Sequence, residues 1–291
     1  MSGRAVEIPD PTDVPAMTER MRRPAARAAI LVLLLTAGRA AHAPSVTYIA
    51  NEGVMITAPG TKVLIDALFG DGLPEYGAAS PATRKPLEGG LAPFDAVDLV
   101  LATHIHRDHF DPGAVLRHLA ANPRARFVST TEAVTRLREV DSVAVRRLGT
   151  RLVGVDVAEG ERRLVARAAG ARVFALGMPH GRRPGLPANL GFLVEVAGCR
   201  LLHIGDTTIG AEEMRPFRLA DQGIDVALLP DWYLLTPDLR TAVREVVRPR
   251  HVVALHLPVE PGEHLAALRA EFPEAHTFDR ELAVWPVPRC G

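Results

Sequence analysis

The chain has 291 residues, 47% of them hydrophobic, and its 34 basic residues are balanced by 34 acidic ones. A chain of this length and composition can bury the core of an enzyme-sized domain. The neutral balance, without runs of basic residues interleaved with aromatic ones, argues against a nucleic-acid partner.

Residues 1–43 are expected to form an N-terminal extension that carries a signal peptide. Basic residues within 22–27 precede an apolar run at 28–35, and the Ala-His-Ala at 41–43 matches the small-x-small pattern of a signal-peptidase site. The apolar run is shorter than the roughly 20 residues of a membrane-spanning helix. We therefore expect an exported protein, periplasmic or extracellular, with no stable membrane insertion after cleavage. An uncleaved N-terminal anchor is the alternative.

Residues 44–291 are expected to form a single domain, which opens with strand-like apolar runs at 46–56 and 63–65. Proline and glycine are then concentrated between residues 70 and 93. This composition predicts an exposed insertion or a lid over the substrate rather than a linker between domains.

Three histidines and one aspartate follow within six positions: His104, His106, Asp108 and His109. An apolar strand at 97–102 precedes them, and Asp111-Pro112 has the pattern of a helix N-cap with proline at the first helical position. Side chains two apart in an extended loop point the same way, so His104 and His106 can hold one ion. Asp108 and His109, which enter the helix, can then face a second ion. The cluster therefore predicts a metal site, and a solvated polar loop is the alternative.

Helices and strands then alternate to the end of the chain. We expect helices at 112–121, after a capping box at 129–132, from 236–237 and at 262–271. Strands are expected at 126–128, 152–157 and 163–166 turned by Glu159-Gly160, 172–176, a hairpin of 191–196 and 200–204, 226–229 and 251–255. Strand clusters alternating with helices in both halves predict an α+β fold, a four-layer αββα sandwich with two facing sheets and helices outside.

Three further polar side chains each close an apolar strand-like run: His180, Asp206 and His256. The order HxHxDH, a lone histidine, Gly-Asp-Thr and a final histidine resembles the metallo-β-lactamase superfamily of metal-dependent hydrolases. The resemblance covers residues 46–278. The opening strands are similar to the branch with ascorbate-phosphate lactonase and phospholipase-D-like members.

Position by position, the resemblance implies two metal ions and a shared carboxylate. The first ion is held by His104, His106 and His180, the second by Asp108, His109 and His256, and Asp206 bridges them. Zinc is the expected metal, with manganese or iron as alternatives for the same donors. Some relatives in this branch work with one ion, so a mononuclear site stays open.

The expected chemistry is hydrolysis by a metal-bound hydroxide. Two divalent ions lower the pKa of a shared water from about 15.7 toward 7, and Asp108 orients it and accepts its proton. The expected substrate is a small ester, lactone or phosphodiester. The alternatives are a phospholipid or acyl-ethanolamine phosphodiesterase, and a non-catalytic metal-dependent binding or sensor protein on the same fold.

Several residues are assigned supporting roles. Asp66 ends an early strand and is expected to accept the second N–H of a ligand imidazole, with an ordinary turn residue as the alternative. Arg182 is a candidate clamp for an anionic group, and Trp232 with Tyr233 a candidate wall of the substrate site. The alternative for Arg182 is an ordinary solvated side chain, and the alternative for Trp232 and Tyr233 is packing beneath their loop. His203 lies three residues before Asp206 and is expected to complete a strand, with a place at the rim of the site as the alternative. Cys199 and Cys290 either pair or stay free.

Overall fold

The computed structural model describes residues 43–290. Residues 1–42, which carry the predicted signal peptide, lie outside the described residues, so the boundary predicted after residue 43 stays a prediction. Within 43–290, none of the helices combines the length and hydrophobicity of a membrane-spanning segment.

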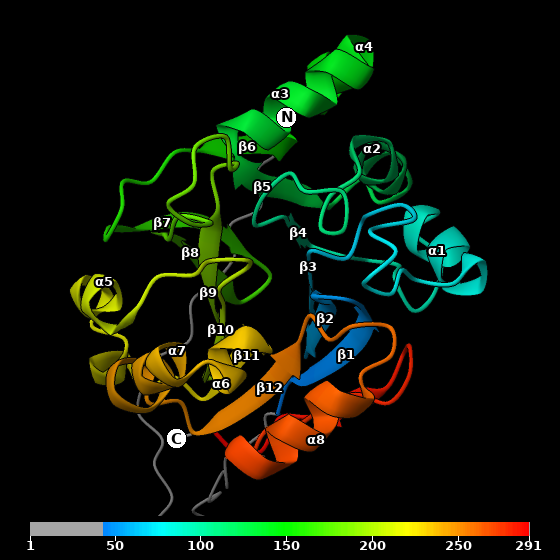
Figure 1. Ribbon diagram of the computed structural model, residues 1–291. Helices are drawn as coiled ribbons and strands as arrows, with labels where there is room; N and C mark the ends of the chain where they lie inside the picture. Colours follow the sequence, from blue (N-terminus) through cyan, green and yellow to red (C-terminus); the bar gives the residue numbers. More distant parts are fainter. Residues whose placement is uncertain (1–42, 291) are drawn as a thin grey trace, which may run out of the picture. The chain divides into compact units, whose positions relative to one another are not determined.

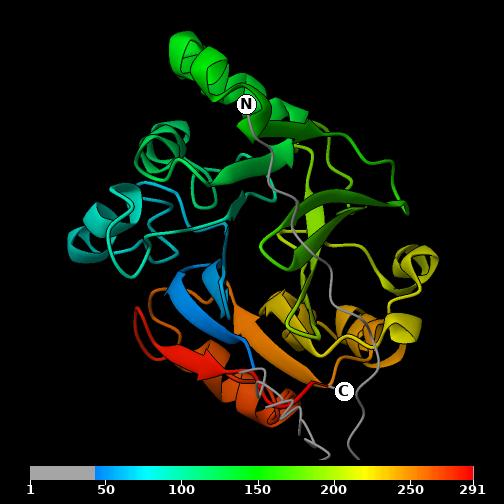
Figure 2. The same ribbon diagram turned by 180° about the vertical axis from the view of Figure 1, so that it is seen from behind.

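Two β-sheets form the centre of the described part (Figure 1). The first has the strand order β13-β1-β2-β3-β4-β5-β6. Its strands are β1 (Ser45–Ala50), β2 (Gly53–Ala58), β3 (Thr61–Ile65), β4 (Leu99–Leu101), β5 (Arg126–Thr130), β6 (Leu152–Val155) and β13 (Val284–Pro286). Strands β1 to β3 are antiparallel and β3 to β6 are parallel. Seen from behind, β13 in red lies beside the blue β1, with which it pairs (Figure 2).

The second sheet has the order β12-β11-β10-β9-β8-β7. Its strands are β7 (Arg162–Ala168), β8 (Ala171–Gly177), β9 (Leu190–Val196), β10 (Cys199–His203), β11 (Val226–Pro230) and β12 (His251–Leu255). Strands β7 to β10 form an antiparallel meander, and β10 to β12 are parallel. The predicted hairpin of β9 and β10 is confirmed, and its turn residues Ala197 and Gly198 both have positive φ.

Helices cover the outer face of each sheet. The first sheet carries α1 (Pro81–Glu88), α2 (Pro112–Ala121), α3 (Thr131–Val140), α4 (Ser142–Leu148) and the 3₁₀ turn η1 (Gly149–Arg151). The second carries α5 (Ala211–Met214), η2 (Arg215–Phe217), η3 (Ala220–Gln222), α6 (Trp232–Leu235), α7 (Pro237–Thr241), the π-helical turn η4 (Ala242–Val247) and α8 (Gly262–Glu271). Apolar side chains from the facing sides of both sheets share one core between them. The predicted αββα order is confirmed.

Three details differ from the sequence-based expectations. Residues 70–93 contain the packed helix α1, which its two prolines concealed, rather than only an exposed insertion. The strand expected at 126–128 continues to Thr130, so Thr130 rather than Ser129 caps α3; the Ser129 hydroxyl instead donates to Ala102 O inside the sheet. The turn at Glu159-Gly160 does not join two paired strands, because β6 and β7 lie in different sheets.

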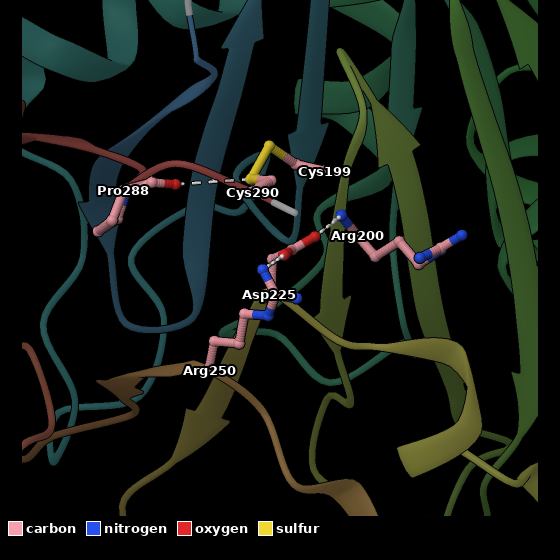
Figure 3. Close-up of a disulfide and its surroundings, with 6 residues drawn as sticks. All are labelled: Cys199, Arg200, Asp225, Arg250, Pro288 and Cys290. Carbon is pink, nitrogen blue, oxygen red and sulfur yellow. Dashed lines mark hydrogen bonds and ion pairs between the residues drawn. A yellow bond between two sulfur atoms is a disulfide. The ribbon is translucent and has the colours of Figure 1, made fainter.

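A disulfide joins Cys199, at the start of β10, to Cys290 near the chain end, with the two Cα atoms 5.2 Å apart (Figure 3). It fixes the segment after β13 to the second sheet, so the C-terminal residues connect the two sheets. Beside it, the buried Asp225 accepts a hydrogen bond from Arg200 N and pairs with Arg250 (Figure 3).

Candidate metal centre

The candidate centre lies at the carboxyl ends of strands from both sheets. The HxHxDH loop follows β4 in the first sheet, while His180, Asp206 and His256 follow β8, β10 and β12 in the second. All seven predicted side chains come together there. Gly205 allows the approach of the Asp206 loop: its φ is +57°, and a Cβ at this position would lie 2.7 Å from the Cβ of Thr103.

Four donor atoms form the first group. Nδ1 of His106 lies 3.1 Å from Nε2 of both His104 and His180, and Asp206 Oδ2 lies 3.7 Å and 3.5 Å from the same two Nε2 atoms. A tetrahedral zinc ion with ligands at 2.0–2.2 Å separates those ligands by about 3.3–3.6 Å. The spacing therefore suits a first-row divalent ion. His106 and His180 are the partly exposed members, so the centre opens to solvent on their side.

The second group uses the other oxygen of the same aspartate. Asp206 Oδ1 lies 3.2 Å from His109 Nε2 and 3.6 Å from His256 Nε2. Asp108 Oδ2 lies 3.7 Å and 3.6 Å from these two nitrogens. Each carboxylate oxygen of Asp206 thus faces a different set of histidines.

Several of these atoms are buried without a hydrogen-bond partner: Asp108 Oδ1, His109 Nε2, Asp206 Oδ1 and His256 Nε2. An unsatisfied buried polar atom costs roughly 1–3 kcal/mol, and a cluster of them in one place needs a compensating group. A cation contacting the nitrogens and oxygens supplies this compensation, so the residues present fit a bound metal.

Asp66 lies behind the ligands at the end of β3. His109 Nδ1 donates to Asp66 Oδ2 at 2.9 Å, while Thr103 donates its backbone N–H to Oδ1 at 2.7 Å and its hydroxyl to Oδ2 at 2.6 Å. His104 Nδ1 in turn donates to the Thr103 hydroxyl at 2.9 Å. This network directs Nε2 of both imidazoles, with its lone pair, toward the centre.

Burial and neighbouring charges act on the ionisation of the centre. Burial, reinforced by His109, holds the pKa of His104 well below its usual value, so this imidazole is neutral. Burial alone would raise the pKa of Asp206, but the imidazole of His109 outweighs it and holds that pKa well below the usual range. Neutral imidazole and ionised carboxylate are the forms that bind metal. Although burial lowers the pKa of His109, Asp206 and Asp66 raise it well above the usual value, so a metal bound there would displace a proton.

Two aromatic side chains flank His256. The ring of Tyr76 meets its imidazole edge-on with centroids 4.0 Å apart, and the Trp232 ring lies 4.9 Å from it. Backbone pairing of Tyr76 with Pro258 fixes the first ring, and a hydrogen bond from Trp232 Nε1 to Thr207 O, at 3.2 Å, fixes the second. Both are partly exposed and form a rim beside the centre.

The other two candidate substrate contacts have different surroundings. Tyr233 is fully buried and donates its hydroxyl to Ile209 O at 2.7 Å, so the expectation that it lines the site is wrong. It follows Trp232 in a helix, where successive side chains diverge by about 100°. The exposed guanidinium of Arg182 is paired with Glu159 and Glu213, which holds two loops together.

Two buried residues of the β1–β2 turn were missed by the sequence reasoning. Asn51 donates to Asp108 O and Oδ2, both at 3.2 Å, and Glu52 lies beneath His109. Neither has metal-ligand spacing, and a polar residue in a tight turn is normally exposed. His203 is buried at the end of β10 and contacts Glu52 O, as expected for a residue that completes a strand.

Comparison with known proteins places the chain in a family. The family model of the beta-lactamase superfamily domain matches residues 61–270, so the chain belongs to this superfamily. A UPF0173 metal-dependent hydrolase of Thermus thermophilus is 28% identical over 219 residues, 74% of this chain and 84% of the relative. One from Nitratidesulfovibrio vulgaris is 30% identical over 214 residues, 72% and 79% of the two chains.

Solved structures agree on the fold. Igni18, a metallo hydrolase from Ignicoccus hospitalis, superposes with a TM-score of 0.56 at 22% identity, over 83% of this chain and 98% of that one. The protein is therefore a metal-dependent hydrolase with the metallo-β-lactamase fold, and its His/Asp cluster is the candidate metal site.

Proposed function

We propose that the protein is a dinuclear hydrolase, with zinc the first metal to test, that cleaves a small ester or lactone. One observation carries the metal count: the two oxygens of Asp206 face two separate groups of histidines. His104, His106 and His180 would hold one ion, and Asp108, His109 and His256 the other. When bound, the ions would supply a water of lowered pKa and polarise the carbonyl oxygen of the substrate.

Asp108 is the proposed proton acceptor. Its Oδ2 faces His109 and His256 and receives the Asn51 amide, whereas its buried Oδ1 has no partner. Oδ1 is therefore the atom free to take the proton released when water attacks the substrate. Asn51 holds the carboxylate so that this oxygen stays available.

The surroundings favour an uncharged acyl substrate over a phosphodiester. Among residues 43–290, the ion pairs of Asp108 and Asp206 are with histidines alone. Arg182, the cation suggested for an anionic group, is already paired with two glutamates. The rim of Tyr76 and Trp232 provides aromatic faces instead.

The test combines metal analysis with a screen of generic esters, lactones and phosphodiesters. We expect two ions per chain, and for Asp108→Ala at least a hundredfold loss of kcat at saturating metal. Glu161→Ala, at an exposed turn, is the control and should keep full turnover. Metal binding without turnover of any substrate would favour the sensor alternative, and activity on phosphodiesters alone would reject the acyl assignment.

We further propose that the protein is exported. The Cys199–Cys290 disulfide supports this, because disulfides persist in oxidising compartments. Cell fractionation with N-terminal sequencing of the mature protein tests it. A chain recovered from the membrane with its apolar N-terminal run would support the uncleaved anchor, and a cytoplasmic full-length chain would reject export.

A further inference from the structure

Glu52 is a fully buried carboxylate in the two-residue turn between β1 and β2. Neither of its side-chain oxygens has a hydrogen-bond partner. Burying an ionisable group in this way is costly unless an opposite charge lies close by. The fold therefore carries an unfavourable group immediately beneath the metal centre.

The neighbours of Glu52 have no proton to offer it. Its Oε2 lies 3.9 Å from His109 Nδ1 and 3.7 Å from His203 Nε2. His109 Nδ1 donates to Asp66, and His203 Nε2 donates to the backbone oxygen of Glu52 itself. Within residues 43–290, these histidines are the only ion-pair partners of Glu52. Neither histidine therefore satisfies the side-chain oxygens of Glu52 with a hydrogen bond.

The position of Glu52 points to the second metal. The carboxylate faces the Nδ1 side of His109, while Nε2 of the same ring faces Asp206 and Asp108. Negative charge behind a ligand imidazole makes that ligand a stronger donor and attracts the cation on its far side. Donor atoms of Glu52, His109 and Asp206 lie within 4.8 Å of one another. Since His109 Nδ1 already donates to Asp66, Glu52 would act on an ion only through the ring.

We infer that Glu52 is a positioning residue that raises the affinity of the His109 side of the centre for a divalent cation without coordinating it. The inference rests on the dinuclear centre proposed above. It gives the turn a specific role, because the carboxyl group that it buries behind His109 is favoured as a carboxylate when a cation lies on the far side of that ring.

The test is a zinc titration of the metal-free full-length protein against a competing chelator. Glu52→Gln keeps the shape of the side chain and removes its charge. We expect it to weaken the second zinc at least tenfold, to leave the first within about twofold, and to leave the melting temperature of the metal-free protein unchanged or higher. Glu52→Asp, which keeps the charge, should restore most of the affinity.

Glu281→Gln is the matched control. Glu281 is a partly buried carboxylate that accepts hydrogen bonds from Ser80 N, Ser80 Oγ and Thr83 Oγ1 at 2.6–2.8 Å. Its substitution should lower the melting temperature and leave both zinc affinities unchanged. This is the opposite of the result expected for Glu52→Gln.

The outcomes separate the two proposals. If the wild type binds a single zinc, the dinuclear centre is rejected. If it binds two and Glu52→Gln binds both as tightly, the role of Glu52 is rejected while the proposed function stands. A Glu52→Gln chain that fails to fold without metal, or Glu52→Asp as weak as Glu52→Gln, would also overturn the inference.

Discussion

Within residues 43–290, Asp206 is the residue whose two carboxylate oxygens face both halves of the candidate centre. Its neighbours Gly205 and Thr207 place it there: the first adopts a positive φ, and the second donates its hydroxyl to Pro179 O at 2.7 Å in the strand-end segment before His180. A change at Asp206 should therefore affect both ions, whereas a change at His256 should affect one.

Asp206→Ala is expected to reduce bound metal to less than one ion per chain, because each group loses a charged donor. His256→Ala should retain about one ion, held by His104, His106 and His180. Metal analysis after gel filtration distinguishes the two variants. Equal metal loss in both would contradict the division into two groups.

The site residues that could be predicted from the sequence are those that stand at a recognisable place in it. The ligand candidates follow apolar strands in a fixed order, and strand ends on one edge meet in space. Nothing in the sequence marks Glu52 and Asn51 in this way, because they are buried only where their turn faces the other sheet. Tyr76 was equally hidden, since its place beside His256 depends on pairing between two irregular loops.

Among the helices, too, those that local residues specify could be predicted from the sequence, and those that depend on packing could not. Helix α2 was predictable because Asp111 and Pro112 begin it, and the Asp111 side chain does accept from Ala114 N at 2.6 Å. Helix α1 was not, because Pro86 lies inside it and its stability comes from packing Thr83 and Leu87 against its neighbours.

Capping of α3 gives a test at this scale. Thr130→Ala removes the hydroxyl that accepts from Ala133 N at 3.1 Å, and should lower the free energy of unfolding by about 1 kcal/mol. Urea denaturation measures the loss. Thr135→Ala, on the exposed face of the same helix, is the control and should stay within about 0.5 kcal/mol of the wild type.

The disulfide gives a second test at the scale of the elements. It closes a segment of 91 residues, and removing such a link by Cys199→Ser with Cys290→Ser should cost about 2–4 kcal/mol. Denaturation with and without a reductant checks this, since the reductant should weaken the wild type and leave the double variant unchanged. A wild type indifferent to reductant would show that the thiols do not pair.

For the whole molecule, the division of the candidate ligands between two sheets is the dominant feature. The HxHxDH loop belongs to the first sheet, and His180, Asp206 and His256 to the second. The alternation of strands and helices was enough to predict this architecture. It was not enough to predict that β13 returns from the chain end to pair with β1, because three residues carry little pattern.

Metal removal should therefore destabilise the entire domain. A ligand at a thousand times its dissociation constant stabilises the folded state by about 4 kcal/mol. We expect a chelator to lower the melting temperature and added zinc to restore it, as followed by calorimetry. The Asp206→Ala chain serves as the control, since chelation should barely change it. A wild type unaffected by chelation would contradict a role of metal in joining the sheets.

The crossing from β6 to β7 is where the chain first passes from one sheet to the other. A polypeptide cut there would yield two pieces, each with part of the donor set and neither able to enclose an ion alone. Their reassembly would then report zinc directly, which makes this crossing a natural place to divide the protein into a split sensor.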